Sequence, residues 1–254
     1  MTIIIIGSLV GLSAGLISTL LGGGAGLIAV PAFYYIIIHN FGADFALQIS
    51  LATCGGMSLF LSLVAVYKHI RNGNIVFNKT TITYIVVFMI GAVIGTLLIK
   101  TLDTSIIKKT FSILLFLSGF WMLLHKEGNI LKLPKIIESI ALSICGIFSV
   151  LLTSSTFATI FFVKVGMNIK KAISLTSFCV LINSISLSFL LVYGINIDVP
   201  KTYGYMSIPL LVSSAPFAIV GSLIAVKFLT ILSHQILHRL FIALMFISAI
   251  IMCF

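Results

Sequence analysis

The sequence predicts an all-α polytopic membrane protein with about eight hydrophobic segments in two inverted repeats, each of which opens with a broken or re-entrant helix. Three observations lead to this prediction: an apolar composition, a pattern that occurs twice, and an uneven distribution of basic residues. Hydrophobic residues make up 60% of the 254 residues and charged residues only 8%, whereas charged residues make up about 25% of a typical soluble domain. A soluble fold has too little interior to bury so many apolar side chains.

Charge-poor segments occupy almost the whole chain. A helix needs about 20 mostly apolar residues to cross a bilayer. Segments of about that length or longer lie near residues 3–37, 45–67, 81–99, 106–124, 137–163, 172–193, 203–226 and 236–254. They leave only short connections, so we expect no separate soluble domain. The first segment has no Lys or Arg before it and is too long for the apolar part of a signal peptide, so we expect it to be retained.

Two of these segments, 3–37 and 137–163, are longer than one crossing needs, and small or hydroxyl-bearing residues interrupt both. Residues 15–24 read GLISTLLGGG, and residues 146–155 read GIFSVLLTSS. Backbone without helical hydrogen bonds is tolerated at membrane depth only where it lines a cavity or is buried in protein. Paired interruptions in the two halves of a chain are therefore the best indication in a sequence of a transporter's substrate site.

Other matches between the two halves support a duplication. Residues 49–53 resemble 173–177, Gly91 and Gly95 correspond to Gly221 and Ala225, and residues 116–122 resemble 246–252. With the interrupted segments included, the offsets are 131, 124, 130 and 130 residues in chain order. We therefore predict a first repeat at residues 1–127, a connection at 128–133 and a second repeat at 134–254. We expect Gly91 and Gly95 to permit close helix packing.

The distribution of Lys and Arg indicates how the two repeats are oriented, because cytoplasmic loops carry an excess of these residues. If all eight segments cross the membrane, seven basic residues lie on one side and eight on the other. If 3–37 and 137–163 instead return to the side from which they start, the counts become eleven and four. The second arrangement predicts inverted repeats and two non-cytoplasmic termini. It places residues 68–79, 126–135, 164–171 and 227–235 on the cytoplasmic side.

The acidic residues indicate which charge the substrate carries. All five lie at or just outside the end of a segment: Asp44, Asp103, Glu127, Glu138 and Asp198. Cation transporters usually keep a carboxylate inside the membrane, so a cationic substrate is disfavoured. The start of a helix carries a partial positive charge and unpaired N–H groups, and glycines let an anion come close to them. We therefore expect the substrate to be a small anion.

Candidate substrate-binding residues follow from the two interruptions. The first offers backbone N–H groups at Gly22, Gly23, Gly24 and Gly26. The second offers hydroxyl donors at Thr153, Ser154, Ser155 and Thr156. Weaker candidates are polar residues in other predicted helices: Gln48, Ser50, Thr53, Ser174, Thr176, Ser177 and Asn183. The alternatives are that the glycines permit helix packing and that the Ser and Thr hydroxyls bond to the carbonyl four residues earlier.

The first interruption also resembles a family signature. Residues 22–31 read GGGAGLIAVP and follow Gly11 and Gly15. This is similar to the signature of the TauE/SafE (sulfite exporter, TSUP) family, which is Gly-x-Gly-Gly-Gly, four mostly apolar residues and Pro. Ala25 stands where the pattern has a Gly, and the second copy departs from the pattern at Thr153, Ser155, Phe157 and Phe162. The resemblance runs through the whole chain, and it implies a permease of the bacterial inner membrane for sulfite or organosulfonates.

Secondary transport is the function that these observations favour, and a channel-like conductor of small inorganic anions is the alternative. We do not expect an enzyme, because no His, Asp, Glu or Lys lies at mid-membrane to activate a serine. The expected partners are a small anionic substrate and the lipid bilayer. The net charge of +10 is explained by the basic cytoplasmic side and by anionic headgroups, so we expect no nucleic-acid partner. The sequence carries no signal for an oligomeric state.

We expect no metal site and no cofactor. His234 and His238 are spaced to share one helical face, but no third ligand lies near them. The four cysteines are far apart and include no C-x-x-C pair: Cys54, Cys145, Cys179 and Cys253. They are typical of small apolar side chains in packed helices.

Overall fold

The part of the chain that the structure describes is almost entirely helical. The computed structural model describes residues 2–21, 23–42, 45–71, 73, 78–124, 133–193, 195, 197–228 and 234–253. In these residues the helices are α1 (Thr2–Leu21), α2 (Ala25–Phe41), α3 (Ala46–Arg71), α4 (Lys79–Thr101), α5 (Thr104–Leu124), α6 (Lys135–Leu152), α7 (Thr156–Lys164), α8 (Ile169–Leu190), α9 (Ile208–Phe228) and α10 (His234–Cys253). A short antiparallel hairpin, β1 (Thr202–Tyr203) and β2 (Met206–Ser207), precedes α9.

Seven of the described helices are long and apolar enough to cross a membrane: α1, α3, α4, α5, α6, α8 and α9. The predicted class, an all-α polytopic membrane protein, is therefore confirmed. The predicted segment 203–226 begins too early, because residues 202–207 form the hairpin and α9 starts only at Ile208. A left-handed Gly204 (φ 54°) turns the chain between the two strands, and glycine adopts this conformation without steric cost.

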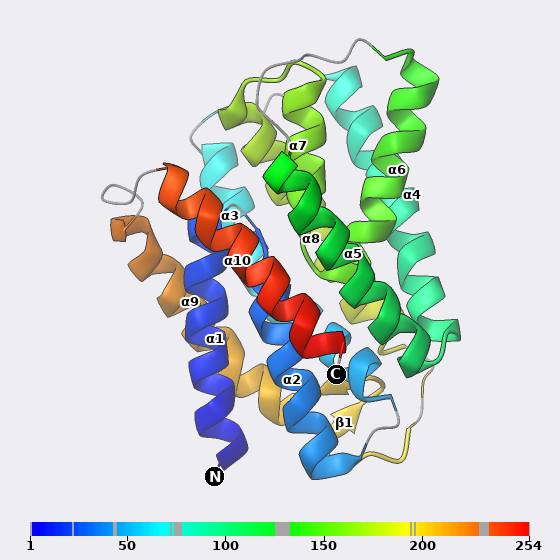
Figure 1. The fold of residues 1–254 in the computed structure, drawn as a ribbon, viewed down its shortest axis with the longest axis vertical. Helices are drawn as coiled ribbons and strands as arrows, with labels where there is room; N and C mark the ends of the chain where they lie inside the picture. The colour runs from blue at the N-terminus through cyan, green and yellow to red at the C-terminus, as the bar shows by residue number, and fades with distance from the viewer. Residues whose placement is uncertain are drawn as a thin grey trace.

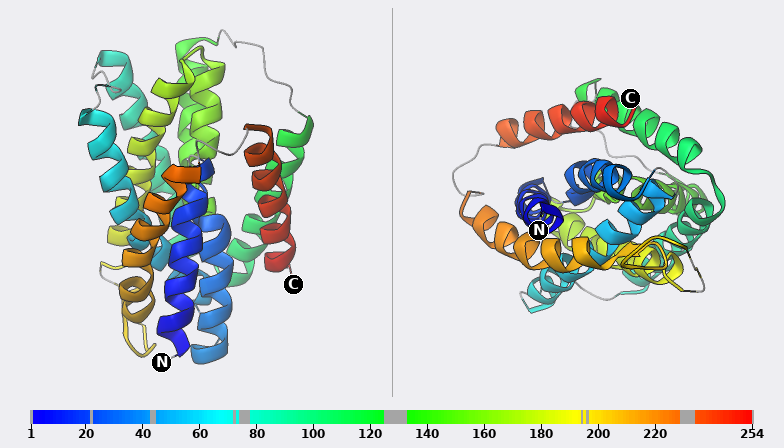
Figure 2. Two further views of the ribbon diagram at one scale, coloured as in Figure 1. Left: turned by 90° about the vertical axis from the view of Figure 1, so that its left-hand side faces the viewer. Right: turned by 90° about the horizontal axis from the view of Figure 1, so that it is seen from below.

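Both long interrupted segments are broken helices. The first segment divides into α1 and α2, and the second divides into α6 and α7. Figures 1 and 2 show each pair as a hairpin whose outer ends lie at the same end of the molecule. The α1–α2 hairpin starts from the lower end in Figure 1, and the α6–α7 hairpin starts from the upper end. Each interrupted segment thus returns to the end from which it starts, and the two hairpins enter from opposite ends.

The helix ends that were predicted to face the cytoplasm gather in the upper half of Figure 1. They are the last turns of α3, α5, α7 and α9 and the first turns of α4, α6, α8 and α10. The junction of α4 with α5 and the hairpin before α9 lie in the lower half of Figure 1, where α1 also begins. Parts of the predicted cytoplasmic loops lie outside the described residues, namely 72, 74–77, 126–132 and 229–233.

The upper end in Figure 1 is expected to face the cytoplasm, because it holds most of the basic residues. Single cysteines that replace Arg71 and Lys171 should both be protected from an impermeant thiol reagent added to intact cells. A cysteine that replaces Lys201, at the lower end, should be labelled. Labelling of Arg71→Cys and Lys171→Cys from opposite sides of the membrane would contradict the inverted arrangement.

Glycines bring α4 and α6 into backbone contact. A Cβ atom added to Gly91 of α4 would lie 2.0 Å from the Ser143 carbonyl oxygen of α6, and one added to Gly146 of α6 would lie 2.5 Å from the Phe88 carbonyl oxygen of α4. Both distances are too short for any side chain. Gly95 also faces α6, since a Cβ atom added to it would lie 3.0 Å from the Cα atom and from the carbonyl oxygen of Ile147. The expected packing role of Gly91 and Gly95 is confirmed.

Glycines also bring α1 and α9 into backbone contact. A Cβ atom on Gly15 of α1 would lie 1.9 Å from the Ala218 carbonyl oxygen, and one on Gly221 of α9 would lie 2.1 Å from the Leu12 carbonyl oxygen. These four residues are 130 or 131 positions away from their counterparts in the α4–α6 contact. In both contacts, a helix that leads into a break packs against a helix from the other half of the chain. The two halves therefore interlock.

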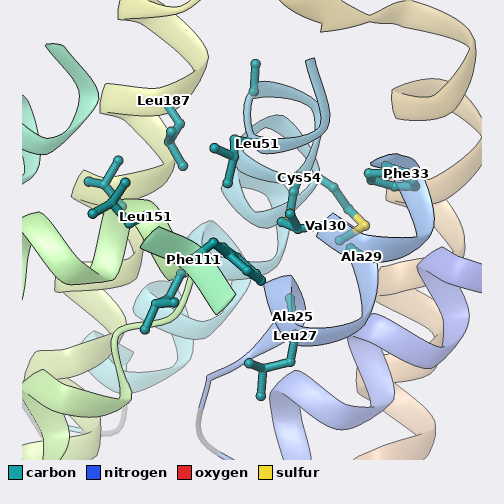
Figure 3. Close-up of a cluster of buried hydrophobic side chains, with 14 of the residues drawn as sticks. Ala25, Leu27, Ala29, Val30, Phe33, Leu51, Cys54, Phe111, Leu151 and Leu187 are labelled. Carbon is teal, nitrogen blue, oxygen red and sulfur yellow. The ribbon is translucent and has the colours of Figure 1, made fainter. Parts of the chain in front are cut away.

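An apolar cluster around α2 holds the first break in place. Figure 3 shows Ala25, Leu27, Ala29, Val30 and Phe33 of α2 facing side chains of the neighbouring helices α3, α5, α6 and α8, and all of these labelled side chains are buried. Lipid tails are as apolar as these side chains, so the cluster is stabilised by close packing rather than by exclusion from water. Cys54 and Cys179 are buried among apolar residues, as expected for small core side chains.

Candidate functional site

The helices that lead into the two breaks end in the same way. The Gly23 N–H donates to the Ser18 carbonyl at 2.8 Å, and the Ser154 N–H donates to the Ser149 carbonyl at 3.0 Å. Each bond spans five residues, as in a Schellman-type helix end. The donors of the two bonds are 131 residues apart, and so are the acceptors. The local backbone structure of the breaks therefore follows the repeat seen in the sequence.

The helices that leave the two breaks also begin in the same way. The Leu27 N–H donates to the Gly24 carbonyl at 3.1 Å, and the Ala158 N–H donates to the Ser155 carbonyl at 3.0 Å. These bonds are again 131 residues apart. Neither Gly24 nor Ser155 caps its helix with a side-chain hydrogen bond. The first N–H groups of a helix have no partner within it, so both helix starts keep donors available for a ligand.

The breaks differ in how they achieve a left-handed turn. In the first break Gly23 and Gly24 have φ values of 141° and 97°, and in the second break Thr153 has a φ of 46°. Glycine adopts such values freely, but a β-branched residue is strained in this region. A threonine held there indicates that the surrounding contacts fix the second break. Gly22, which aligns with Thr153, lies outside the described residues.

The two breaks touch each other. A Cβ atom added to Gly26 would lie 1.4 Å from Thr153 Oγ1 and 2.7 Å from the Leu152 carbonyl oxygen. One added to Gly23 would lie 3.6 Å from Thr156 Oγ1 and 3.9 Å from Ser154 Oγ. Residues 23–26 and 153–156 therefore form one cluster, which we call the break junction.

Other helices surround the break junction. Cys54 of α3 places its Sγ atom 3.7 Å from Thr153 Oγ1. Phe241 of α10 covers Gly24, since its ring would lie 3.1 Å from an added Cβ atom. Ser248, on the same helix, donates a hydrogen bond to the Leu27 carbonyl. The junction is thus enclosed by helices on the α3 side and on the α10 side.

The polar side chains at the second break are only partly satisfied. Ser154 Oγ and Thr156 Oγ1 are hydrogen-bonded at 2.9 Å. Asn183 of α8 donates through Nδ2 to the Ser149 carbonyl at 2.7 Å, the same carbonyl that accepts the Ser154 N–H. In the described part of the chain, three buried atoms here have no hydrogen-bond partner: Ser149 Oγ, Ser155 Oγ and Asn183 Oδ1. Buried polar atoms without partners are uncommon, and these three are groups to which a ligand could bond.

The predicted residues of α3 lie in two other settings. Ser50 and Thr53 donate to the carbonyls of Ala46 and Ile49, each at 2.7 Å, which is the local bonding that was the alternative to a cavity role. Thr53 Oγ1 also accepts the Ser207 N–H at 3.0 Å and so ties α3 to β2. Gln48 lies at the end of the helix bundle, where its Nε2 donates to the Leu102 carbonyl at 3.0 Å.

The predicted residues of α8 other than Asn183 also have protein partners. Thr176 donates to the Ala172 carbonyl at 2.9 Å and accepts a bond from Thr159 of α7 at 2.8 Å. Ser177 donates to the Ile173 carbonyl at 3.1 Å. Ser174 Oγ lies 3.0 Å from His69 Nδ1 at the end of α3. The structure therefore brings Gly23, Gly24 and Gly26 together with residues 153–156 and Asn183. It places the other predicted polar residues along the interfaces of α3 and α8.

Ser149 and Cys54 contact the second break and were not predicted. For Ser149 a signal was present, because Ser18 and Ser149 occupy the same position in the two matching segments. Cys54 had no such signal, since its contact with Thr153 joins residues 99 positions apart. Among the described residues, no group of three His, Cys, Asp or Glu side chains could hold a metal ion.

Comparison with known proteins gives two matches. The sequence model of the family described as "Sulfite exporter TauE/SafE" matches residues 7–252, nearly the whole chain. A "Probable membrane transporter protein" from Haemophilus influenzae is 28% identical over 219 residues, which cover 82% of this chain and 82% of that protein. No solved structure matches the chain.

Proposed function

The chain belongs to the sulfite exporter TauE/SafE family and is an integral membrane transporter, and from this premise we propose that it carries small sulfur-containing oxyanions such as sulfite or an organosulfonate. We further propose that the break junction binds the substrate, that the protein is a secondary transporter rather than an enzyme, and that it acts in a bacterial inner membrane.

The observation that supports an anionic substrate is the meeting of two helix starts at the break junction. The start of a helix carries about half a positive charge and unpaired N–H groups, and neither start has a side-chain cap. No described carboxylate belongs to either break: Asp103 joins α4 to α5, Glu138 lies in the first turn of α6, and Asp198 precedes the hairpin. Unpaired N–H groups at two helix starts, in breaks whose described residues include no carboxylate, support an anionic ligand.

Ser154, Ser155 and Thr156 add hydroxyl donors to the backbone N–H groups. A sulfite or sulfonate group has three oxygen atoms that accept hydrogen bonds, and donors from two sides can surround it. Hydrogen bonds to charged groups are about twice as strong as those between neutral groups. The combination of glycine backbone on one side and hydroxyls on the other therefore matches a compact oxyanion.

The hairpins suggest how the substrate gains access from either side. The α1–α2 and α6–α7 hairpins enter from opposite ends of the molecule and meet at the break junction (Figure 1). A movement of one hairpin relative to the other would open the junction toward one end while the second hairpin closes the other. Alternating access by the movement of one repeat against the other is typical of inverted-repeat transporters.

Uptake by proteoliposomes tests this proposal. We expect the purified protein to take up radiolabelled sulfite or a sulfonate, and we expect unlabelled sulfonates to compete. Amines and divalent metal cations should neither compete nor be transported, because the described part of the break junction offers hydrogen-bond donors and no carboxylate. Accumulation against a gradient that is lost when the ion gradients collapse would distinguish a transporter from a channel. Uptake of amines or metal cations, with no response to sulfite or sulfonates, would overturn the proposal.

A further inference from the structure

Asn183 offers a hydrogen-bond acceptor that no described group of the protein uses. Its side chain is 4% exposed, and its Nδ2 donates to the Ser149 carbonyl at 2.7 Å. Because a carbonyl oxygen can only accept, this bond requires the NH2 group on that side and fixes the orientation of the amide. The remaining atom, Oδ1, is buried and has no partner among the described residues.

This acceptor belongs to the second break. The Ser149 carbonyl that holds the Asn183 amide also accepts the Ser154 N–H at 3.0 Å. Asn183 Oδ1 is therefore one amide group away from the backbone of the break. Two further buried hydroxyls have no partner among the described residues: Ser149 Oγ in the last turn of α6 and Ser155 Oγ just before α7. A hydroxyl can donate or accept a bond, whereas an amide oxygen can only accept one.

A fully deprotonated oxyanion, such as the sulfite dianion or an unsubstituted sulfonate, satisfies only part of this set. Its oxygen atoms accept bonds from the hydroxyls and from backbone N–H groups, but they have no hydrogen to give to Asn183 Oδ1. A ligand that fills every position carries an anionic group and, beside it, an O–H or N–H donor. The first half of the chain has no matching amide, since Leu59 occupies the position that the 124-residue offset aligns with Asn183. The acceptor is thus present on one side of the junction only.

We propose that Asn183 makes this transporter select anions that also carry a hydrogen-bond donor, in particular organosulfonates with a hydroxyl or amino group on the neighbouring carbon. The proposal rests on the proposed function and names the substrate class of the same site. The anionic group lies at the helix starts and the hydroxyls of the break, and the donor of the substrate bonds to Asn183 Oδ1.

Two sulfonates of equal size test the proposal. In 2-hydroxyethanesulfonate a hydroxyl occupies the place that a methyl group has in propane-1-sulfonate. We expect the purified protein to bind the hydroxyl compound at least about tenfold more tightly, since a site that hydrogen-bonds a substrate hydroxyl rejects the analogue that lacks it. In Asn183→Leu the ratio of the two affinities should fall to about one, because the acceptor is gone.

The ratio separates a specific role from a general disturbance of the break, which would weaken both ligands alike. Asn40→Leu is the matched control, because Asn40 Nδ2 also donates to a backbone carbonyl at 2.7 Å, near the end of α2. We expect this variant to keep the discrimination of the parent. If Asn183→Leu does not fold, Asn183→Gln, which moves the amide by one carbon, should lower the ratio in the same way.

The outcomes also distinguish a failure of the proposed role of Asn183 from a failure of the proposed sulfonate transport. Equal affinity of the parent protein for the two sulfonates would overturn the role of Asn183 and leave sulfonate transport standing. A ratio that Asn183→Leu leaves unchanged would do the same. Binding of neither sulfonate, together with no sulfite uptake, would overturn the proposed function and this inference with it.

Discussion

Replacing Gly26 by valine is expected to abolish transport. Even the first carbon of a side chain at this position would lie 1.4 Å from Thr153 Oγ1 and 2.7 Å from the Leu152 carbonyl oxygen. The carbonyl belongs to the backbone and cannot rotate away, so the two breaks would have to separate. Overpacking of this kind costs about 1–3 kcal/mol, which corresponds to a loss of about fivefold to over a hundredfold in an equilibrium constant. Substrate uptake and sulfonate affinity of the reconstituted variant would be measured together.

Gly56→Ala is the matched control for this change. Gly56 is also a buried helical glycine, but an added Cβ atom would meet only the ends of flexible side chains, Met206 Cε and Leu211 Cδ1, at 3.0 Å. We expect this variant to retain most of its transport. In the double variant Gly26→Ala/Thr153→Gly, the contacts with the Thr153 side chain are removed and only the contact with the Leu152 carbonyl remains. Glycine also suits the left-handed φ at position 153, so activity should exceed that of Gly26→Ala. Normal uptake by Gly26→Val would show that the breaks need not touch.

Ser155→Ala is expected to lower substrate affinity without lowering stability. The Ser155 hydroxyl is buried and has no partner among the described residues, so its removal breaks no bond of the folded protein. A bond from this hydroxyl to a bound oxyanion contributes about 1.5–3 kcal/mol, and its loss corresponds to about a tenfold to a hundredfold weaker affinity. Binding titration and thermal unfolding of the same preparation measure the two quantities.

Ser62→Ala is the control for the hydroxyl. Ser62 is buried too, but its hydroxyl already donates to the Leu59 carbonyl at 3.0 Å. This substitution should leave substrate affinity unchanged. If Ser155→Ala binds sulfite and sulfonates as tightly as the parent does, the second break does not supply the donor that we assign to it.

The positions of the breaks were predictable because local chemistry determines them. Three consecutive glycines, and a Thr-Ser-Ser run, interrupt apolar segments that are too long for one crossing, and the helices end at Leu21 and Leu152. The positive-inside rule also predicted which helix ends lie together, since it depends only on the order of segments and on their flanking charges. The positions of the breaks and the sides on which the helix ends lie both depend on residues that are close together in the sequence.

The contacts across the site were not predictable, because they join residues far apart in the sequence. Gly26 meets Thr153, 127 positions away, and no sequence pattern indicates which glycine faces which hydroxyl. The role of Ser50 was equally open, because a hydroxyl that lines a cavity and one that bonds to the carbonyl four residues earlier have the same spacing. The structure shows the second kind of bond at Ser50. Asn183 was predicted only as a polar residue that is costly to bury, and its bond to Ser149 depends on the packing of α8 against α6.

One substrate is expected to occupy both breaks at once, and protection of the breaks from thiol labelling tests this expectation. Single cysteines would replace Ala25 in the first break or Ser155 in the second, in a protein whose Cys54, Cys145, Cys179 and Cys253 are changed to alanine. A transported sulfonate is the protecting ligand, because sulfite itself reacts with the maleimides that are used to label thiols. The sulfonate should slow the labelling of both cysteines and should not affect a cysteine that replaces Lys201. A sulfonate that is transported but protects only one break, or neither, would contradict the account.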